Sequence, residues 1–163
     1  PFLHGLDGRK RPVPVECDDA DSAACEGARD ALNAVGVSTS ASSLGAPGTE
    51  NVTRLVVAKW PAARIVRGGH TLEQGPRQSG VYARLTDNTI ELLDKNGDVA
   101  RSAPPGTALI AALRPRADEL VWLVTALDDA GLAAGVEALT AKALRNAFAV
   151  AVSQEGAEKL PLK

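Results

Sequence analysis

The fold class is decided by residues 13–36, Val-Pro-Val-Glu-Cys-Asp-Asp-Ala-Asp-Ser-Ala-Ala-Cys-Glu-Gly-Ala-Arg-Asp-Ala-Leu-Asn-Ala-Val-Gly. The stretch begins with a predicted strand from Val13 to Cys17, and the acidic and hydroxyl residues at 18–22 suit a helix N-terminus. Apolar residues then recur at spacings of three and four, which predicts a helix with one apolar stripe. These residues are Cys25, Ala28, Leu32 and Val35. Gly36 can end the helix in a left-handed conformation, so the stretch predicts a βα unit.

The rest of the chain continues the alternation of strands and helices. A weak strand is expected at 37–43, a loop at 45–51 and a buried strand at 52–60. Pro61 suits the start of a short helix that Gly68-Gly69 would end. Antiparallel strands joined by tight turns are predicted at 81–86, 89–94 and 99–103. Further strands are expected at 108–113, 120–127 and 148–152, and further helices at about 129–139, with Leu132, Val136 and Leu139 as its buried stripe, and 140–146.

Together these elements predict an α/β fold, with α+β as the alternative class. We expect a mixed β-sheet with three to four helices packed on it and a central antiparallel meander. A chain of 163 residues is near the usual size of one domain and can bury about two thirds of its unfolded surface. The chain is therefore predicted to form one domain over 1–163, with two βα-containing halves, about 1–50 and 51–163, as the alternative division.

Composition excludes several classes of protein. Apolar residues make up 45% and charged residues 23% of the chain, which is typical of an ordered globular domain. Aromatic residues are only 3% and the formal net charge is −2, which argues against binding to nucleic acid. No apolar run approaches the roughly 20 residues of a membrane-spanning helix. The start at Pro1 without an initiator Met suggests a processed or excised fragment.

Two cysteines bear on the cellular compartment. Cys17 ends the first predicted strand and Cys25 lies in the first turns of the following helix, a junction that can bring two Cα atoms within bridging range. We predict a disulfide, which would stabilise the fold by about 2 to 3 kcal/mol and persist in an oxidising compartment. Two reduced, buried thiols are the alternative. A metal site is not expected, because the spacing of the cysteines and of the only histidines, His4 and His70, matches no zinc pattern.

Sequence patterns that resemble catalytic or cofactor motifs have simpler explanations. The run 94–98, Asp-Lys-Asn-Gly-Asp, starts like a calcium loop but lacks the Glu at the twelfth position, so a hairpin turn is the better interpretation. No Gly-x-Ser-x-Gly elbow is present, and no Lys follows the glycines at 68–69 or 75 in the way a phosphate loop requires. No catalytic residue, cofactor or metal is predicted.

Positive charge is concentrated in one part of the chain. Between positions 54 and 84 six basic residues stand against the single acid Glu73; they are Arg54, Lys59, Arg64, Arg67, Arg77 and Arg84. The segment 70–80 is predicted as a loop rich in hydrogen-bonding groups, the kind of place where binding residues are found. The candidate ligand-binding residues are Arg64, Arg67 and Arg77 as forked donors, with His70, Gln78 and Ser79 setting orientation. The alternative is an ordinary solvated helix face with a connecting loop.

Four stretches of the chain carry a resemblance to a known group of proteins. They are Pro1-Phe2-Leu3-His4-Gly5, residues 11–17 with Cys25, residues 72–84 (Leu-Glu-Gln-Gly-Pro-Arg-Gln-Ser-Gly-Val-Tyr-Ala-Arg) and residues 123–131 (Leu-Val-Thr-Ala-Leu-Asp-Asp-Ala-Gly). In these the chain resembles uncharacterised, exported actinobacterial proteins. In that group such a segment follows a domain similar to the C-terminal, ligand-capping domain of cobalamin carriers. The resemblance implies a C-terminal module and export, and it brings neither catalytic residues nor a cobalamin site.

The leading hypothesis is therefore a non-catalytic, extracytoplasmic module, secreted or associated with the cell envelope. Its partner would be a small anionic ligand, a cell-envelope component or another protein. One alternative is an enzyme that uses the loop of His70 and Arg77, with Glu73 or Asp87 as the acid. Another is a structural spacer or dimerisation module.

Overall fold

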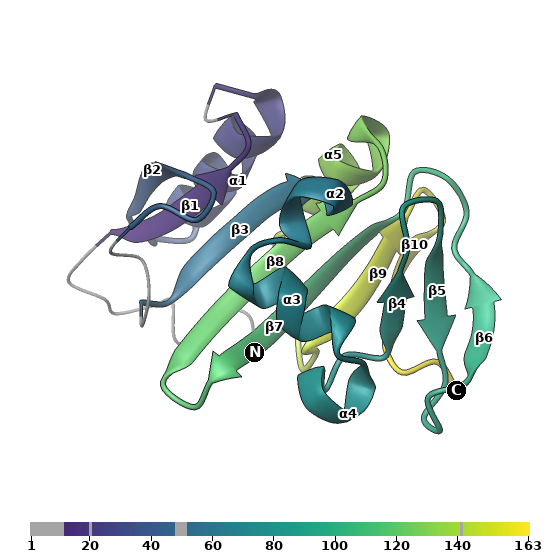
Figure 1. The fold of residues 1–163 in the computed structure, drawn as a ribbon. Helices are drawn as coiled ribbons and strands as arrows, with labels where there is room; N and C mark the ends of the chain where they lie inside the picture. Colours follow the sequence, from purple (N-terminus) through teal and green to yellow (C-terminus); the bar gives the residue numbers. More distant parts are fainter. Residues whose placement is uncertain (1–11, 20, 48–51, 141) are drawn as a thin grey trace.

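A seven-stranded sheet forms the centre of the molecule (Figure 1). The computed structural model describes residues 12–19, 21–47, 52–140 and 142–163. The sheet order is β10-β9-β7-β8-β3-β1-β2. Its strands are β1 (Val13–Cys17), β2 (Thr39–Ser43), β3 (Arg54–Lys59), β7 (Ala108–Arg116), β8 (Glu119–Ala126), β9 (Ala149–Ser153) and β10 (Gly156–Lys159). Strands β2, β1, β3 and β8 are mutually parallel, and β7, β9 and β10 add antiparallel pairs, so the predicted mixed α/β sheet is confirmed.

Helices cover both faces of the sheet. Figure 1 shows α1 (Ala23–Ala34) and α5 (Asp129–Glu137) behind the sheet. On the front face lie two short helices, α2 (Trp60–Ala63) and α3 (Arg67–Glu73), and a third, α4 (Pro76–Ser79), follows α3 near the lower end of the sheet. The described residues thus contain five helices instead of three to four, because the segment between β3 and β4, expected to hold one helix and a loop, folds into three.

The first βα unit forms as the sequence predicts. The Ser22 hydroxyl accepts a hydrogen bond from the backbone N–H of Cys25 at 3.2 Å and caps α1. Gly36 follows the helix with a φ of +86°, a conformation that a side chain would disfavour. Cys25, Ala28 and Leu32 are buried against the sheet, whereas Val35 is 44% exposed because it lies at the C-cap, where the helix ends.

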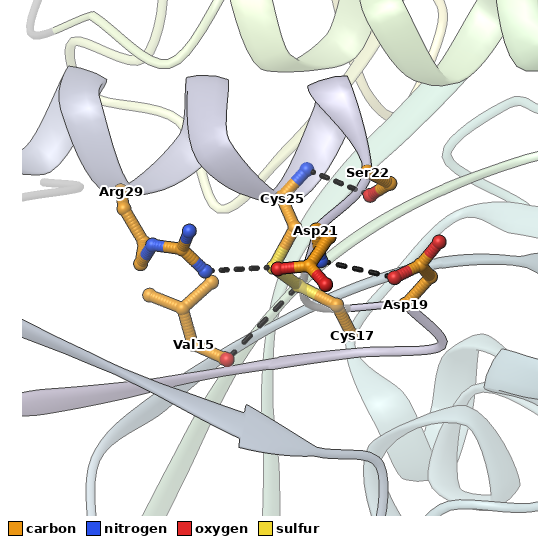
Figure 2. Close-up of a disulfide and its surroundings, with 7 residues drawn as sticks. All are labelled: Val15, Cys17, Asp19, Asp21, Ser22, Cys25 and Arg29. Carbon is orange, nitrogen blue, oxygen red and sulfur yellow. Dashed lines mark hydrogen bonds between the residues drawn. A yellow bond between two sulfur atoms is a disulfide. The ribbon is translucent and has the colours of Figure 1, made fainter.

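The predicted disulfide between Cys17 and Cys25 is present. Figure 2 shows the bridge between the end of β1 and the first turn of α1, with a Cα–Cα distance of 6.1 Å. Both residues are buried in the core. The Arg29 guanidinium lies 3.5 Å from the Cys25 sulfur. The bridge therefore fixes the start of α1 on the strand that precedes it.

Two apolar cores lie on the two faces of the sheet. Under α1 and α5 the core includes Val15, Leu32 and Trp122, and on the other face it includes Trp60 and Leu123. Helix α5 approaches the sheet closely, since a Cβ at its Gly135 would lie only 2.7 Å from that of Ala108. Three predicted stripe residues, Leu132, Val136 and Leu139, are buried, although α5 ends at Glu137.

Three local predictions were wrong. Gly68-Gly69 does not end a helix but lies in the first turn of α3, where a Cβ on Gly69 would lie 1.9 Å from the Ala63 carbonyl oxygen. Close packing of α3 on the preceding turn is what requires glycine there. The described residues 142–146 form turns instead of a regular helix. Strand β10 was missed because its four residues are all exposed and lack an alternating apolar pattern.

The predicted meander forms a second, three-stranded antiparallel sheet in the order β4-β5-β6. Its strands are β4 (Ala83–Leu85), β5 (Ile90–Leu93) and β6 (Val99–Ser102). Residues 94–98 make the hairpin turn that we preferred to a calcium loop, with Asp94 accepting hydrogen bonds from the backbone N–H groups of Asn96 and Asp98 at 2.8 and 3.1 Å. The C-terminal segment joins this sheet to the main one through the Leu162 N–H, which donates to the Leu93 carbonyl at 2.9 Å.

The edge of the main sheet at β10 carries charged side chains. Arg101 of β6 donates to both carboxylate oxygens of Glu158 in β10, and this hydrogen bonding lowers the pKa of Glu158 below its ordinary value.

None of the helices in the described part of the chain has the length and apolarity that a membrane crossing requires. Residues 1–11, which include His4 and the first stretch of the resemblance, and part of the loop expected at 45–51 lie outside the described residues.

Removal of the disulfide should lower stability by a defined amount. The bridge joins residues eight positions apart, and closing so short a loop contributes about 2 to 3 kcal/mol on the chain-entropy model. We expect Cys17→Ala with Cys25→Ala to lose about that much free energy of unfolding in a urea titration. The unmodified protein should react with no thiol reagent when denatured without reductant. If two free thiols per chain were found after denaturation without reductant, the bridge would be contradicted.

Candidate functional site

A chain of alternating charges crosses one face of the sheet beneath the candidate residues. The Arg54 Nε lies 2.9 Å from Glu16 Oε2, and one terminal nitrogen of Arg54 lies 2.8 Å from Glu119 Oε1. The other oxygen of Glu119 lies 3.0 Å from a terminal nitrogen of Arg67 in α3. We call these four residues, from β1, β3, β8 and α3, the charge chain.

Burial makes the charge chain a structural element. The side chains of Glu16, Arg54 and Glu119 are at most 5% exposed, whereas that of Arg67 is 38% exposed. The other Glu16 oxygen accepts the Gly45 N–H at 2.8 Å. Two acids and two bases leave the chain electrically neutral, as buried charges need to be. Arg54, counted with the basic segment in the sequence, therefore belongs to the interior and to no ligand site.

Arg64, the first candidate residue, is occupied by surface ion pairs. Its guanidinium binds Glu73 at 3.1 Å and Asp87 at 3.3 Å. The hydrogen bond to Glu73, with the smaller contribution of Asp87, raises the pKa of Arg64. Arg64 does not line the groove that contains Arg67, His70 and Gln78. It binds both acids, Glu73 and Asp87, that the enzyme hypothesis assigned to His70.

The segment 76–79 forms α4 instead of an open loop, and this gives Ser79 a structural part. Its hydroxyl donates to the Gly75 carbonyl at 2.9 Å and accepts the Val81 N–H at 3.0 Å. The Ser79 side chain thus binds the backbone before α4 and the backbone of the segment that follows it. Arg77 on the same helix is exposed and does not line the groove of His70.

Three of the six candidates, Arg67, His70 and Gln78, lie together along one groove of about 320 Å³. We call it the polar groove, and its remaining lining residues are Thr71, Gln74, Arg114 and Pro115. Among the described residues no Asp or Glu lines it. Since the charge of Arg67 is balanced within the charge chain, Arg114 supplies the net positive charge of the groove.

A second groove, of about 510 Å³, adjoins the first and is mainly apolar. We call it the apolar groove, and its lining residues are Gln78, Ser79, Gly80, Ala112, Arg114, Leu120, Trp122 and Phe148. Phe148 is 68% exposed although it is one of only two phenylalanines in the chain. Gln78 and Arg114 line both grooves, so the two grooves border each other at these residues.

Arg114 and Phe148 were missed as site residues. In the sequence Arg114 stands in an Arg-Pro-Arg stretch that predicts a turn, and Phe148 begins a predicted strand. Neither pattern indicates a ligand. They meet because β7 and β9 are neighbours in the sheet, with the Ala112 N–H donating to the Phe148 carbonyl at 2.8 Å.

The grooves suit binding better than the chemistry of an acid and base pair. His70 is exposed, and within the described part of the chain its imidazole forms no hydrogen bond or ion pair, although its backbone N–H donates to the Val66 carbonyl at 2.9 Å. Arginine and glutamine supply donors for an anion. Among residues 12–19, 21–47, 52–140 and 142–163 there is no cluster of three His, Cys, Asp or Glu residues that could hold a metal ion.

A separate crevice of about 480 Å³ lies where β1, β3 and β8 end. Asp18, Lys59 and Asp129 line it, with Lys59 bound to Asp129 at 3.2 Å. Partial burial raises the pKa of Asp18 above its ordinary value, and the charge of Lys59 opposes this shift. The carboxyl ends of parallel strands often form binding crevices, but this one has mixed charge and a mainly apolar floor.

The chain was compared with known proteins. No family model matches it, and no curated protein matches its sequence. The resemblance to exported actinobacterial proteins therefore stays a prediction, and the site has to be argued from its own geometry.

Breaking the charge chain should be far more costly than breaking an exposed ion pair. Glu119→Gln removes the buried acid between two arginines, and we expect a loss of about 3 to 5 kcal/mol in the free energy of unfolding. The matched control Glu73→Gln breaks the exposed pair with Arg64 and should cost less than about 1 kcal/mol. Equal urea midpoints for the two variants would contradict the importance of the buried chain.

Asp18 should destabilise the fold in its charged form. Its pKa is raised on folding from about 3.8, so the native state binds the proton more tightly and stability falls as pH rises through this range. Asp18→Asn should therefore raise the melting temperature at pH 7 and lose that advantage below about pH 3. Thermal melts at both pH values test this. Asp98→Asn, in an exposed turn, serves as the control.

Proposed function

We propose that this protein is a non-catalytic module of an extracytoplasmic compartment that binds a small anion in the polar groove. The observation that carries the proposal is the convergence of Arg67, His70, Gln78 and Arg114 along a groove that no described carboxylate lines. A set of forked and amide donors without a competing acid is what an anionic group requires.

The charge chain supports this by preorganising one of the donors. Glu119, fully buried, holds one terminal nitrogen of Arg67 at 3.0 Å. An arginine has five N–H donors, so the rest of the guanidinium stays available at the groove. Because Arg67 is already ordered, a ligand would bind it with a smaller loss of side-chain entropy.

The compartment is inferred from the disulfide. A bridge buried at the junction of β1 and α1 persists where thiols are oxidised, as in secreted proteins and at cell surfaces. The resemblance to exported actinobacterial proteins points in the same direction. The ligand would then be a small extracytoplasmic molecule or an anionic group of an envelope component.

The enzyme alternative has less support. It needs an acid beside His70, and the two acids considered for that part, Glu73 and Asp87, both bind Arg64. A spacer or dimerisation role would not account for the hydrogen-bond donors that converge on the polar groove. We therefore favour binding over both alternatives.

Titration of the isolated protein with inorganic phosphate and with acetate, followed by NMR of backbone amides, tests the proposal. We expect saturable shifts at the amides of His70, Gln78 and Arg114, and binding about tenfold or more weaker in Arg114→Gln, since one charged hydrogen-bonding partner contributes about 1.5 to 3 kcal/mol. The control Arg84→Gln removes an exposed arginine of β4, away from both grooves, and should bind normally. No saturable shift with either anion would overturn the proposal.

A further inference from the structure

The polar and apolar grooves have two lining residues in common. Arg114 and Gln78 line both of them, and the combined surface has cationic and amide donors at one end and apolar side chains at the other. Building on the proposed function, we infer that the two grooves are one site and that its ligand is a free, single-chain amphipathic anion, with a carboxylate in the polar groove and a hydrocarbon chain in the apolar groove.

The apolar groove is lined by a large apolar side chain, that of Phe148, which is not buried in the core. Phe148 is 68% exposed, yet its backbone is fixed beside β7 because its carbonyl accepts the Ala112 N–H at 2.8 Å. Leu120 and Trp122 of β8 line the same groove. An exposed aromatic residue whose backbone is anchored next to other apolar side chains gives a hydrocarbon chain an apolar surface to cover.

The polar end places the charge where a carboxylate would need it. A terminal nitrogen of Arg114 lies 3.5 Å from the Ala117 carbonyl, a weak contact that leaves its other donors available. Arg114 is two residues from Ala112 on strand β7, so the residue that carries the guanidinium is a near neighbour in the chain of one that lines the apolar groove. An anion bound by Arg114 and Gln78 would thus leave its attached chain beside Leu120 and Phe148.

Volume and charge favour a free molecule over a bilayer. The apolar groove measures about 510 Å³, within the range of small-molecule sites, which is about 300 to 1,000 Å³. Binding to anionic membranes relies on clusters of Lys and Arg, roughly four to eight of them. The whole chain has a formal net charge of −2. We therefore assign the apolar groove to the chain of one soluble amphiphile.

A series of straight-chain carboxylates, from acetate through butanoate to octanoate, tests the inference by NMR titration below the concentrations at which micelles form. Each fully buried methylene can tighten binding about fourfold, so octanoate should bind the unmodified protein at least about tenfold more tightly than butanoate. Phe148→Ser should abolish most of that dependence on chain length and leave acetate binding unchanged. The matched control Ile65→Ser replaces an apolar residue that is 81% exposed outside both grooves and should keep the full dependence.

The outcomes separate the two proposals. If acetate, butanoate and octanoate bind equally well at His70 and Arg114, the anion site stands and the amphiphile inference is overturned. If dependence on chain length persists in Phe148→Ser, or if octanamide binds as tightly as octanoate, the inference also fails. If no anion binds at all, the proposed function fails with it. Far-UV circular dichroism of each variant verifies that the fold is intact.

Discussion

The structure depends on the buried ion pairs of Glu16, Arg54, Glu119 and Arg67. These residues come from three neighbouring parallel strands and from α3, so their charges have to be brought together before any of them can leave water. The ion pair of Arg67 with Glu119 joins α3 to β8. The outermost member, Arg67, is also the donor at the polar groove, so the same interaction that orders the interior orients a residue of the candidate site.

The disulfide and the charge chain act on adjacent parts of β1. Cys17 ties the end of this strand to α1 on one face of the sheet, while Glu16, the preceding residue, points to the other face and binds Arg54. Successive side chains of a strand alternate between faces, so two neighbouring residues anchor two layers. Strand β1 is therefore held on both sides, and the parallel half of the sheet is built around it.

The two grooves lie at the opposite, antiparallel side of the sheet, where β7, β8 and β9 meet the short helices. Here the sheet leaves Phe148 exposed and Arg114 at the junction of a polar and an apolar surface. An aromatic-poor chain with an acidic balance would not suggest such a site. Its properties come from the way donors and apolar side chains of distant segments are grouped, and not from the composition of any one segment.

By itself, the sequence determined the features that depend on local spacing: the βα unit of residues 13–36, the disulfide, the hairpin turn at 94–98 and the mixed α/β class. Caps, turns and apolar periodicity are encoded within a few residues, so they can be read without knowledge of the fold. Only the tertiary structure decided that Arg54 is internal, that Arg64 is paired with Glu73 and Asp87, and that Arg114 and Phe148 line the same groove. Burial and ion pairing between strands far apart in the chain depend on sheet order and register, which no local pattern specifies.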